Sequence, residues 1–258
     1  MNLIKRTIGG SIILIILVVT TFLGHNALSL EFTIFSLIAI HEITNAFRNI
    51  NINPPKELLY LCDLLIMLGA YLFKSNIYII AISFSIVLIL IYMLFGEDVN
   101  FVDILASVFI LMYVPLLMGM IIKIGNTKYI WPIYITAWGS DTFAYLTGSL
   151  IGKNKVKSIA HISPKKTIEG SIGGVIGAMI LNIIYIHYAG IKIGLGFVIV
   201  FSIIGAILSQ IGDLVASFIK RKTGIKDFGN LIPGHGGIMD RFDSMIFIAP
   251  LFYLFSIL

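Results

Sequence analysis

The chain has 258 residues, of which 58% are hydrophobic and only 12% are charged, and its mean hydropathy is +1.01. This composition leaves too little polar surface to cover a soluble globule, so it indicates an integral membrane protein. The net charge of +5 does not indicate nucleic acid as a partner, because the basic residues fall in short loops between apolar stretches. We expect membrane lipid and phosphate groups as partners instead.

Nine apolar segments are each near the length that crosses about 30 Å of hydrocarbon. They lie at residues 8–23, 28–47, 58–73, 76–95, 101–122, 129–150, 168–188, 193–217 and 242–258. The sequence therefore predicts an all-α fold, a polytopic membrane helix bundle with about nine transmembrane helices. Lys5 and Arg6 precede the first segment as in a signal peptide, but no convincing cleavage site follows, so we expect this helix to be retained.

The distribution of lysine and arginine predicts the orientation of these spans. If the N-terminus is cytoplasmic, alternation places 14 of the 18 basic residues inside and leaves only Lys74, Lys123, Lys128 and Lys192 outside. An N-in, C-out topology follows. The two most basic loops, 151–167 and 218–241, then face the cytoplasm, where nucleotides are available.

The end of the eighth span carries polar side chains at helical spacing. Asp213, Ser217, Lys220 and Arg221 lie at i, i+4, i+7 and i+8, so they share one helix face. Charges are costly at the centre of a bilayer, which places this face in a loop or a water-filled cavity. A carboxylate, a hydroxyl and two cations are therefore expected to face one polar space.

The loop that follows combines glycines with charges. Lys226 and Asp227 precede glycines at 229, 234, 236 and 237, which deny the chain a regular helix and let backbone N–H groups approach a phosphate. The last helix is expected to open at Asp240, with Asp243 one turn on. Asp213 and Asp240 are predicted to converge on Mg²⁺, which prefers oxygen ligands.

The loop before the seventh span predicts an anion site. Ser163 is a candidate helix cap and Pro164 suits the first helical turn, so a helix is expected to start there. Lys165 and Lys166 would then lie beside unpaired N–H donors. Ordinary capping combined with the inside location of basic residues is the alternative interpretation.

Two stretches resemble the phosphatidate cytidylyltransferases, the CDP-diacylglycerol synthases. Residues 217–243 resemble the signature of that family through Ser217, Lys220-Arg221, Lys226-Asp227, Gly229, Pro233, His235-Gly236-Gly237 and Asp240-Arg241-Phe242-Asp243. The stretch from Asp141 through Gly152-Lys153 to Ser163-Pro164-Lys165-Lys166-Thr167-Ile168-Glu169-Gly170 resembles its other cytoplasmic motif. The resemblance covers residues 136–243, whereas the first 100 or so residues match only as hydrophobic spans.

The resemblance implies an enzyme of phospholipid biosynthesis that transfers CMP from CTP to phosphatidic acid, giving CDP-diacylglycerol and pyrophosphate. It implies Mg²⁺, with a second cation as an option, and a homodimer. The protein is expected to be integral to the cytoplasmic (inner) membrane, with its active site facing the cytoplasm. We expect one membrane domain, 1–258, with N-terminal helical spans at 1–125 and a catalytic portion at 126–258.

Roles follow by resemblance. Catalytic roles are expected for Ser217, Lys220, Arg221, Lys226, His235 and Arg241. Substrate binding is expected for Asp141, Lys153, Ser163, Lys165, Lys166, Thr167, Glu169, Asp227, Gly236 and Gly237. Asp213, Asp240 and Asp243 are the expected metal residues, Asp243 and Asp141 being candidates for the outer sphere or a second cation.

Two other functions remain open at this point. A CTP-dependent polyprenol or phytol kinase carries related motifs, but it would release CDP instead of pyrophosphate. A transporter or lipid-binding protein would have paired broken helices at the bilayer midplane, whereas the polar residues here gather on one side of the membrane.

His41 and Glu42 interrupt the second span and are expected to serve helix packing or the interface, with a substrate cavity as the alternative. The single cysteine, Cys62, is expected to be a buried structural thiol.

Overall fold

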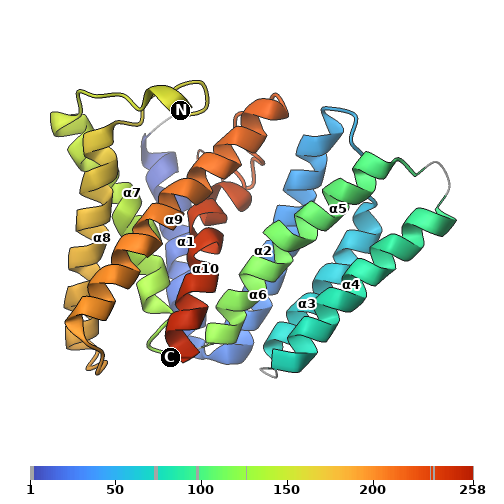
Figure 1. Ribbon diagram of the computed structural model, residues 1–258, viewed down its shortest axis with the longest axis horizontal. Coiled ribbons are helices and arrows are strands. Elements are labelled where there is room, and N and C mark those ends of the chain that lie inside the picture. The colour runs from blue at the N-terminus through green and yellow to red at the C-terminus, as the bar shows by residue number, and fades with distance from the viewer. Residues whose placement is uncertain are drawn as a thin grey trace. The chain divides into compact units, whose positions relative to one another are not determined.

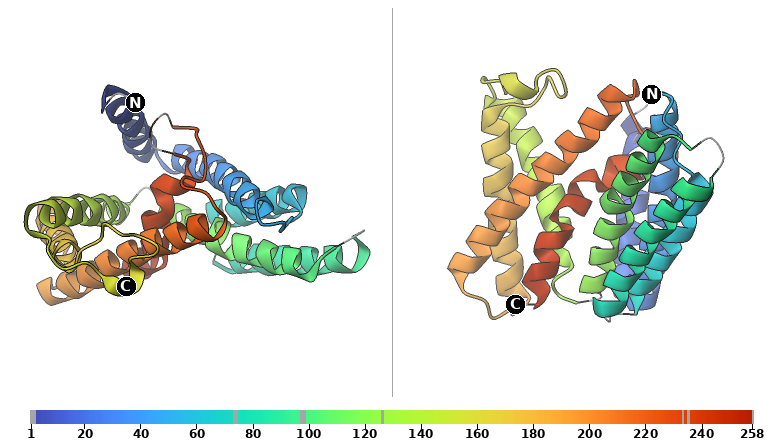
Figure 2. Two further views of the ribbon diagram at one scale, coloured as in Figure 1. Left: turned by 90° about the horizontal axis from the view of Figure 1, so that it is seen from above. Right: turned by 45° about the vertical axis from the view of Figure 1, so that its right-hand side comes forward.

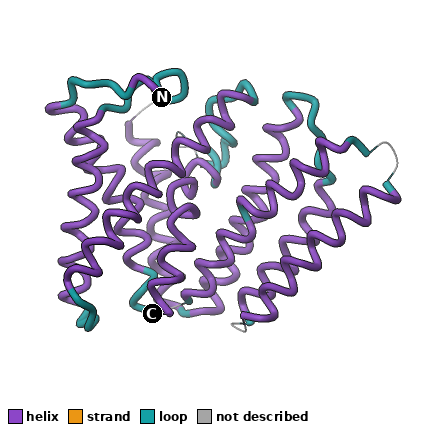
Figure 3. The backbone as a smooth tube through the Cα atoms, viewed as in Figure 1, coloured by secondary structure: helices purple, strands orange, loops and turns teal. Residues whose placement is uncertain are grey.

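The computed structural model describes residues 3–72, 75–96, 99–125, 127–232, 234 and 236–257, with side chains from residue 10 onward except that of Ser75. Within these ranges the chain forms ten α-helices and one short 3-10 helix, Lys157–Ile159. The described residues contain isolated bridges but no strand, as the purple helices and teal loops of Figure 3 show. The predicted all-α fold is confirmed.

Five helical stretches in the described part of the chain are long and apolar enough to cross a membrane. They are His25–Arg48, Asn76–Phe95, Phe101–Ile124, Ile168–Tyr188 and Leu195–Lys222. Their length and composition make the chain an integral membrane protein. The count of nine spans and the N-in, C-out topology stay predictions.

The chain divides into two compact units, the first made of Met1–Asn126 and Lys222–Arg241. Its helices are α1 (Leu3–Leu23), α2 (His25–Arg48), α3 (Lys56–Tyr71), α4 (Ser75–Phe95), α5 (Phe101–Tyr113) and α6 (Pro115–Ile124) (Figure 1). Helix α3 packs against α2, α4 and α6. The predicted span at 101–122 is broken at Val114, because Pro115 has no N–H and its ring obstructs a continuous helix.

The second unit comprises Thr127–Arg221 and Phe242–Leu258. It contains α7 (Trp131–Ile151), α8 (Ile168–Tyr188), nearly all of α9 (Leu195–Lys222) and most of α10 (Met239–Ile257). Helices α7 and α8 lie side by side in Figures 1 and 2. A Cβ added at Gly170 or Gly174 would lie 2.8 or 2.7 Å from a backbone oxygen of α7, so these glycines allow the close helix contact.

The predicted seventh span, 168–188, coincides with α8 (Ile168–Tyr188), but the predicted helix cap at Ser163 is wrong. Helix α8 begins at Ile168, and its cap is Thr167, whose Oγ1 accepts a hydrogen bond from the Gly170 N–H at 3.1 Å. Thr167 has an extended backbone and pairs with Lys155 in an isolated bridge, while the residues before it form a turn in which the Lys166 N–H donates to the Ser163 oxygen. Pro164 therefore lies in the loop and not in the first helical turn.

Two other predicted helix positions are confirmed. Asp213, Ser217, Lys220 and Arg221 all lie on α9, which runs further than the predicted end at 217. Helix α10 begins at Met239, next to the predicted start at Asp240. The assignment of the whole chain to one domain with a catalytic portion at 126–258 stays a prediction.

Candidate functional site

A polar cavity of about 460 Å³ lies in the second unit, between α7, the start of α8 and α9. Its lining residues are Asp141, Ala144, Tyr145, Gly148, Ser149, Lys165, Lys166, Thr167, Gly170, Ser171, Gln210 and Asp213. Five of them were predicted as site residues: Asp141, Lys165, Lys166, Thr167 and Asp213. A cavity with two lysines and two aspartates suits a ligand that carries phosphate and metal ions.

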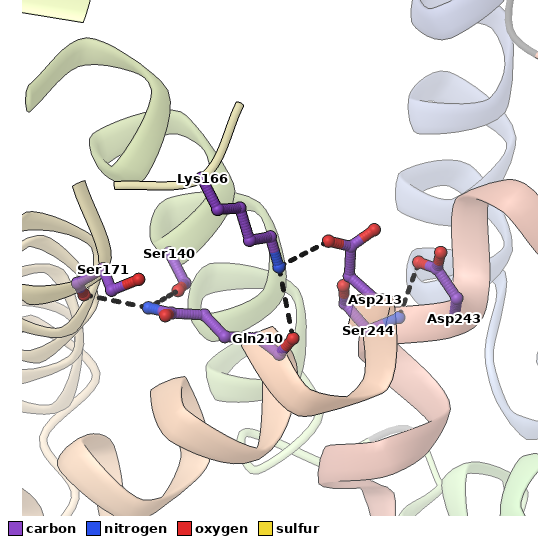
Figure 4. Close-up of polar contacts among 7 residues, drawn as sticks. All are labelled: Ser140, Lys166, Ser171, Gln210, Asp213, Asp243 and Ser244. Atoms are coloured by element: carbon purple, nitrogen blue, oxygen red, sulfur yellow. Dashed lines mark hydrogen bonds and ion pairs between the residues drawn. The ribbon is translucent and has the colours of Figure 1, made fainter. Parts of the chain in front are cut away.

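An ion pair crosses this cavity. The Nζ atom of Lys166 lies 2.6 Å from Oδ2 of Asp213, and both side chains are partly exposed, at 24% and 33%. Figure 4 shows the lysine amine reaching from the loop before α8 to α9, where it also donates to the backbone oxygen of Gln210 at 3.3 Å. The pair joins a predicted phosphate-binding lysine to a predicted metal-binding aspartate.

Gln210 holds the wall of the cavity together. Its Nε2 donates to Oγ of Ser140 on α7 at 3.3 Å and to the backbone oxygen of Ser171 on α8 at 3.0 Å (Figure 4). One amide group on α9 therefore fixes two neighbouring helices one turn before Asp213. The sequence interpretation missed Gln210, although a glutamine in an apolar span requires hydrogen-bond partners.

Asp213 and Asp243 come together because α9 and α10 pack closely beside them. A Cβ added at Gly212 would lie 2.5 Å from the backbone oxygen of Asp243, so only glycine fits there. Asp243 is 6% exposed, and Asp213, Lys220 and Asp141 are its electrostatic neighbours. Its Oδ1 accepts a hydrogen bond from the Ser244 N–H at 2.7 Å (Figure 4).

This donor set fits Mg²⁺. The neighbouring groups offer carboxylate oxygens, the ligand type that Mg²⁺ prefers. Among the described residues no group of three or more His, Cys, Asp and Glu is arranged to hold a metal by itself. Mg²⁺ commonly takes one or two carboxylates and completes its shell with water and substrate phosphates, so a smaller protein set is sufficient.

The segment 222–241 belongs to the first unit. Its folding centres on Asp240, whose Oδ2 accepts hydrogen bonds from the N–H groups of Phe228 at 2.7 Å and Gly237 at 2.9 Å. Gly236 has a φ of +82°, and a Cβ there would lie 2.5 Å from Oδ2 of Asp240. These two bonds fold the backbone of the segment around the Asp240 carboxylate, and the role of Asp240 as a cation ligand stays a prediction.

The remaining predicted residues lie outside the cavity. Glu169 accepts hydrogen bonds from the backbone and side-chain amides of Asn154, which ties the preceding loop to α8. Ser163 donates its N–H to the Ile159 oxygen at 2.9 Å in a turn. Lys153, Arg221, Lys226, Asp227 and Arg241 are exposed, Lys220 is buried, and Ser217 is half-buried.

His235 lies outside the described residues. Asp213 belongs to the second unit and Asp240 to the first, so a cation shared by both stays a prediction. The cavity thus gathers five of the expected site residues, the segment 222–241 carries another group, and others, such as Lys220 and Asp243, belong to neither.

Comparison with known proteins adds an independent finding. The profile of the cytidylyltransferase family matches residues 4–258. A phosphatidate cytidylyltransferase of Staphylococcus haemolyticus is 34% identical over 251 residues, which cover 95% of this chain and 96% of that protein. Proteins of the same name from Staphylococcus saprophyticus and Staphylococcus aureus are 43% and 42% identical over 123 residues, 48% of this chain and 46% of each relative. The chain belongs to the cytidylyltransferase family.

Proposed function

We propose that this protein is a phosphatidate cytidylyltransferase, which transfers CMP from CTP to phosphatidic acid. The observation that carries the proposal is the similarity to a relative of that name along nearly the whole length of both chains. The polar cavity beside Lys166 and Asp213 supports it, because it offers cations and carboxylates to two phosphate-bearing substrates.

The reaction needs no nucleophilic side chain. An oxygen of the lipid phosphate forms a bond to the α-phosphorus of CTP, and the bond from that phosphorus to the bridging oxygen of the β-phosphate breaks. Pyrophosphate carries away the electron pair of the broken bond. The protein must bring two polyanions together, align them and offset their charge.

We assign these tasks to basic residues from both motifs. Lys165 and Lys166 reach into the cavity and would clamp phosphate groups there. Lys220 and Arg221 lie at the end of α9, beyond Asp213, and would bind phosphates or the leaving pyrophosphate. Lys226 and Arg241, which flank the glycines at 229, 234, 236 and 237, are expected to act with Lys220 and Arg221.

We assign Asp213 and Asp240 to Mg²⁺, with Asp243 and Asp141 as neighbours for its water or for a second cation. Bound Mg²⁺ would neutralise charge on the phosphate oxygens. The carboxylates alone would repel the phosphates of the nucleotide. Substrate and metal are therefore expected to bind together.

We infer that the protein lies in the cytoplasmic membrane with both basic loops inside. The asymmetry of 14 basic residues against 4 supports this orientation. In intact cells Lys157→Cys should resist a membrane-impermeant thiol reagent and react after the membrane is opened. Free labelling in intact cells would contradict the orientation and the access to cytoplasmic CTP.

We also infer a homodimer, on the resemblance alone. Light scattering of the purified protein, corrected for bound detergent, should give twice the chain mass of 28.5 kDa. A mass of one chain at all concentrations would contradict the dimer without affecting the proposed reaction.

The direct test supplies purified protein with CTP, phosphatidic acid and Mg²⁺. CDP-diacylglycerol and pyrophosphate should appear in equal amounts, and Asp213→Asn protein should form both far more slowly. Release of CDP with a phosphorylated lipid alcohol, when a polyprenol is supplied, would identify a lipid kinase instead. Absence of any product with either lipid would favour a binding or transport protein.

A further inference from the structure

Besides Asp240, a second carboxylate of the first unit contacts the segment 222–241. It belongs to Glu42, which is far away in the sequence. Glu42 lies in α2, a candidate membrane span, and is only 5% exposed. Its Oε1 accepts the backbone N–H of Ile238 at 3.0 Å, and its Oε2 accepts that of Met239 at 2.9 Å. Each oxygen of the carboxylate therefore binds one N–H group at the start of α10.

These N–H groups are among those that a helix cannot satisfy by itself. The first N–H groups of an α-helix have no intrahelical acceptor, and the helix dipole favours a negative charge beside them. Met239 is the first residue of α10, so Glu42 caps this helix from another helix, 197 residues away in sequence. A buried carboxylate with two N–H donors holds the start of α10 firmly, because hydrogen bonds to charged groups are stronger than those between neutral groups.

The same carboxylate explains two glycines of the segment. A Cβ added at Gly229 would lie 2.4 Å from Oε1 of Glu42, and one added at Gly237 would lie 2.1 Å from it. Neither glycine has a positive φ, so backbone conformation does not require glycine at these positions. The lack of space requires glycine there, because the backbone of the segment lies directly against the carboxylate of Glu42.

We propose that Glu42 is a positioning residue for catalysis, whose carboxylate lies against Gly229 and Gly237, holds the start of α10 and thereby places Asp240. The inference rests on the proposed function. Glu42 acts through backbone contacts and needs no contact with substrate. Asp240 binds the N–H groups of Phe228 and Gly237. The backbone of the segment is therefore held by two carboxylates, those of Glu42 and Asp240.

The test compares two identical changes on one helix. Glu42→Gln removes the charge and sets an amide NH₂ against a backbone N–H, so one hydrogen bond is lost. Glu31→Gln is the matched control, because Glu31 is also buried on α2, at 6% exposure, but its hydrogen-bond partner is Thr20 on α1. We expect the maximal rate to fall at least tenfold in Glu42→Gln and less than twofold in Glu31→Gln. Half-saturating CTP and lipid concentrations should change little.

A second readout reports the segment itself. Leu231 is 58% exposed, and the only cysteine, Cys62, is buried, so a spin label can be placed at Leu231→Cys alone. Glu42→Gln should increase the mobility of this label, while Glu31→Gln should leave it unchanged. This readout does not depend on the reaction. If the wild type made no CDP-diacylglycerol, the proposed function would fail while the contact remained testable.

A steric pair sharpens the test further. Gly229→Ala should slow the enzyme in the wild-type background, because the added methyl group displaces the carboxylate of Glu42. In a Glu42→Ala background the space is open, so the same change should have a much smaller further effect. Additive losses would show that Gly229 and Glu42 act separately and would overturn the inference.

Three other results would also overturn it. One is a normal maximal rate in Glu42→Gln. Another is an equal loss of rate in Glu31→Gln, which would point to a general need for buried carboxylates in α2. The third is a lower rate with unchanged label mobility, which would mean that Glu42 acts by some route other than the segment.

Discussion

The N-termini of α8 and α10 each follow a polar loop with basic residues, but they are capped in different ways. Helix α8 is capped by Thr167, the residue directly before it, and Glu169 of its own first turn holds Asn154 of the loop. Helix α10 is capped by Glu42, which comes from α2. The cap of α8 therefore comes from its sequence neighbours, and the cap of α10 comes from a remote helix.

The two kinds of cap predict different effects of substitutions in the loops that precede α8 and α10. A change at the local cap of α8 is expected to act mainly on its own turn, since Thr167 and Glu169 bind residues that are close in sequence. A loop held by a remote carboxylate depends on the packing of another helix as well. The segment 222–241 is therefore the more sensitive of the two, and α2 contributes to the site although it carries none of the residues expected to touch substrate.

The largest effect is expected from the two proposed metal carboxylates. Asp213→Asn and Asp240→Asn should each lower the maximal rate at least about 10²- to 10³-fold, because each removes charge that offsets the phosphates. Rates of purified variants at saturating Mg²⁺ provide the measurement, with elution profile and thermal unfolding as controls for folding. A near-normal rate in either variant would remove that residue from the metal site.

A smaller loss is expected from the cations at the end of α9. Lys220→Ala and Arg221→Ala should slow turnover by about 10- to 100-fold, which corresponds to about 1.4 to 2.7 kcal/mol. Lys155→Ala should have little effect, because Lys155 is exposed and its charge is screened by salt. Steady-state rates at varied CTP and lipid separate a lower maximal rate from weaker binding.

Equal small losses at all three of these positions would contradict the site assignment. They would favour a diffuse basic surface that attracts anionic lipid without contacting the transition state.

The smallest effect is expected at the local cap of α8. Thr167→Val removes the acceptor for the Gly170 N–H and should lower the free energy of unfolding by about 1 kcal/mol. In a chain of this size the loss corresponds to a fall of about 2–4 °C in the unfolding temperature. Thr167→Ser keeps the hydroxyl and should retain most of the stability. A loss of stability in Thr167→Ser as large as that in Thr167→Val would contradict the assignment of this stability to the hydroxyl cap.

Apolar length predicted the positions of most helices, because a membrane span requires a long uninterrupted hydrophobic stretch. Helical spacing also placed Asp213 and Lys220 correctly on one helix. The cap of α8 was misjudged because Ser163 and Pro164 match the local pattern of a helix cap, although they lie in a turn and Thr167 caps the helix.

The long-range contacts could not be predicted in the same way. Glu42 and the start of α10 are almost 200 residues apart, and nothing local to either marks the other. Gln210 poses the same problem, since its partners Ser140 and Ser171 lie on two other helices. The available signal was general: a buried polar side chain in an apolar span needs a partner.

The central claim is the transfer of CMP to a lipid phosphate, and the fate of isotopic label in CTP tests it most directly. With phosphatidic acid and Mg²⁺, label at the α-phosphorus should enter the lipid product, and label at the γ-phosphorus should leave entirely as pyrophosphate. Transfer of the γ-label to lipid, with the α-label retained in free CDP, would contradict the account and identify a kinase.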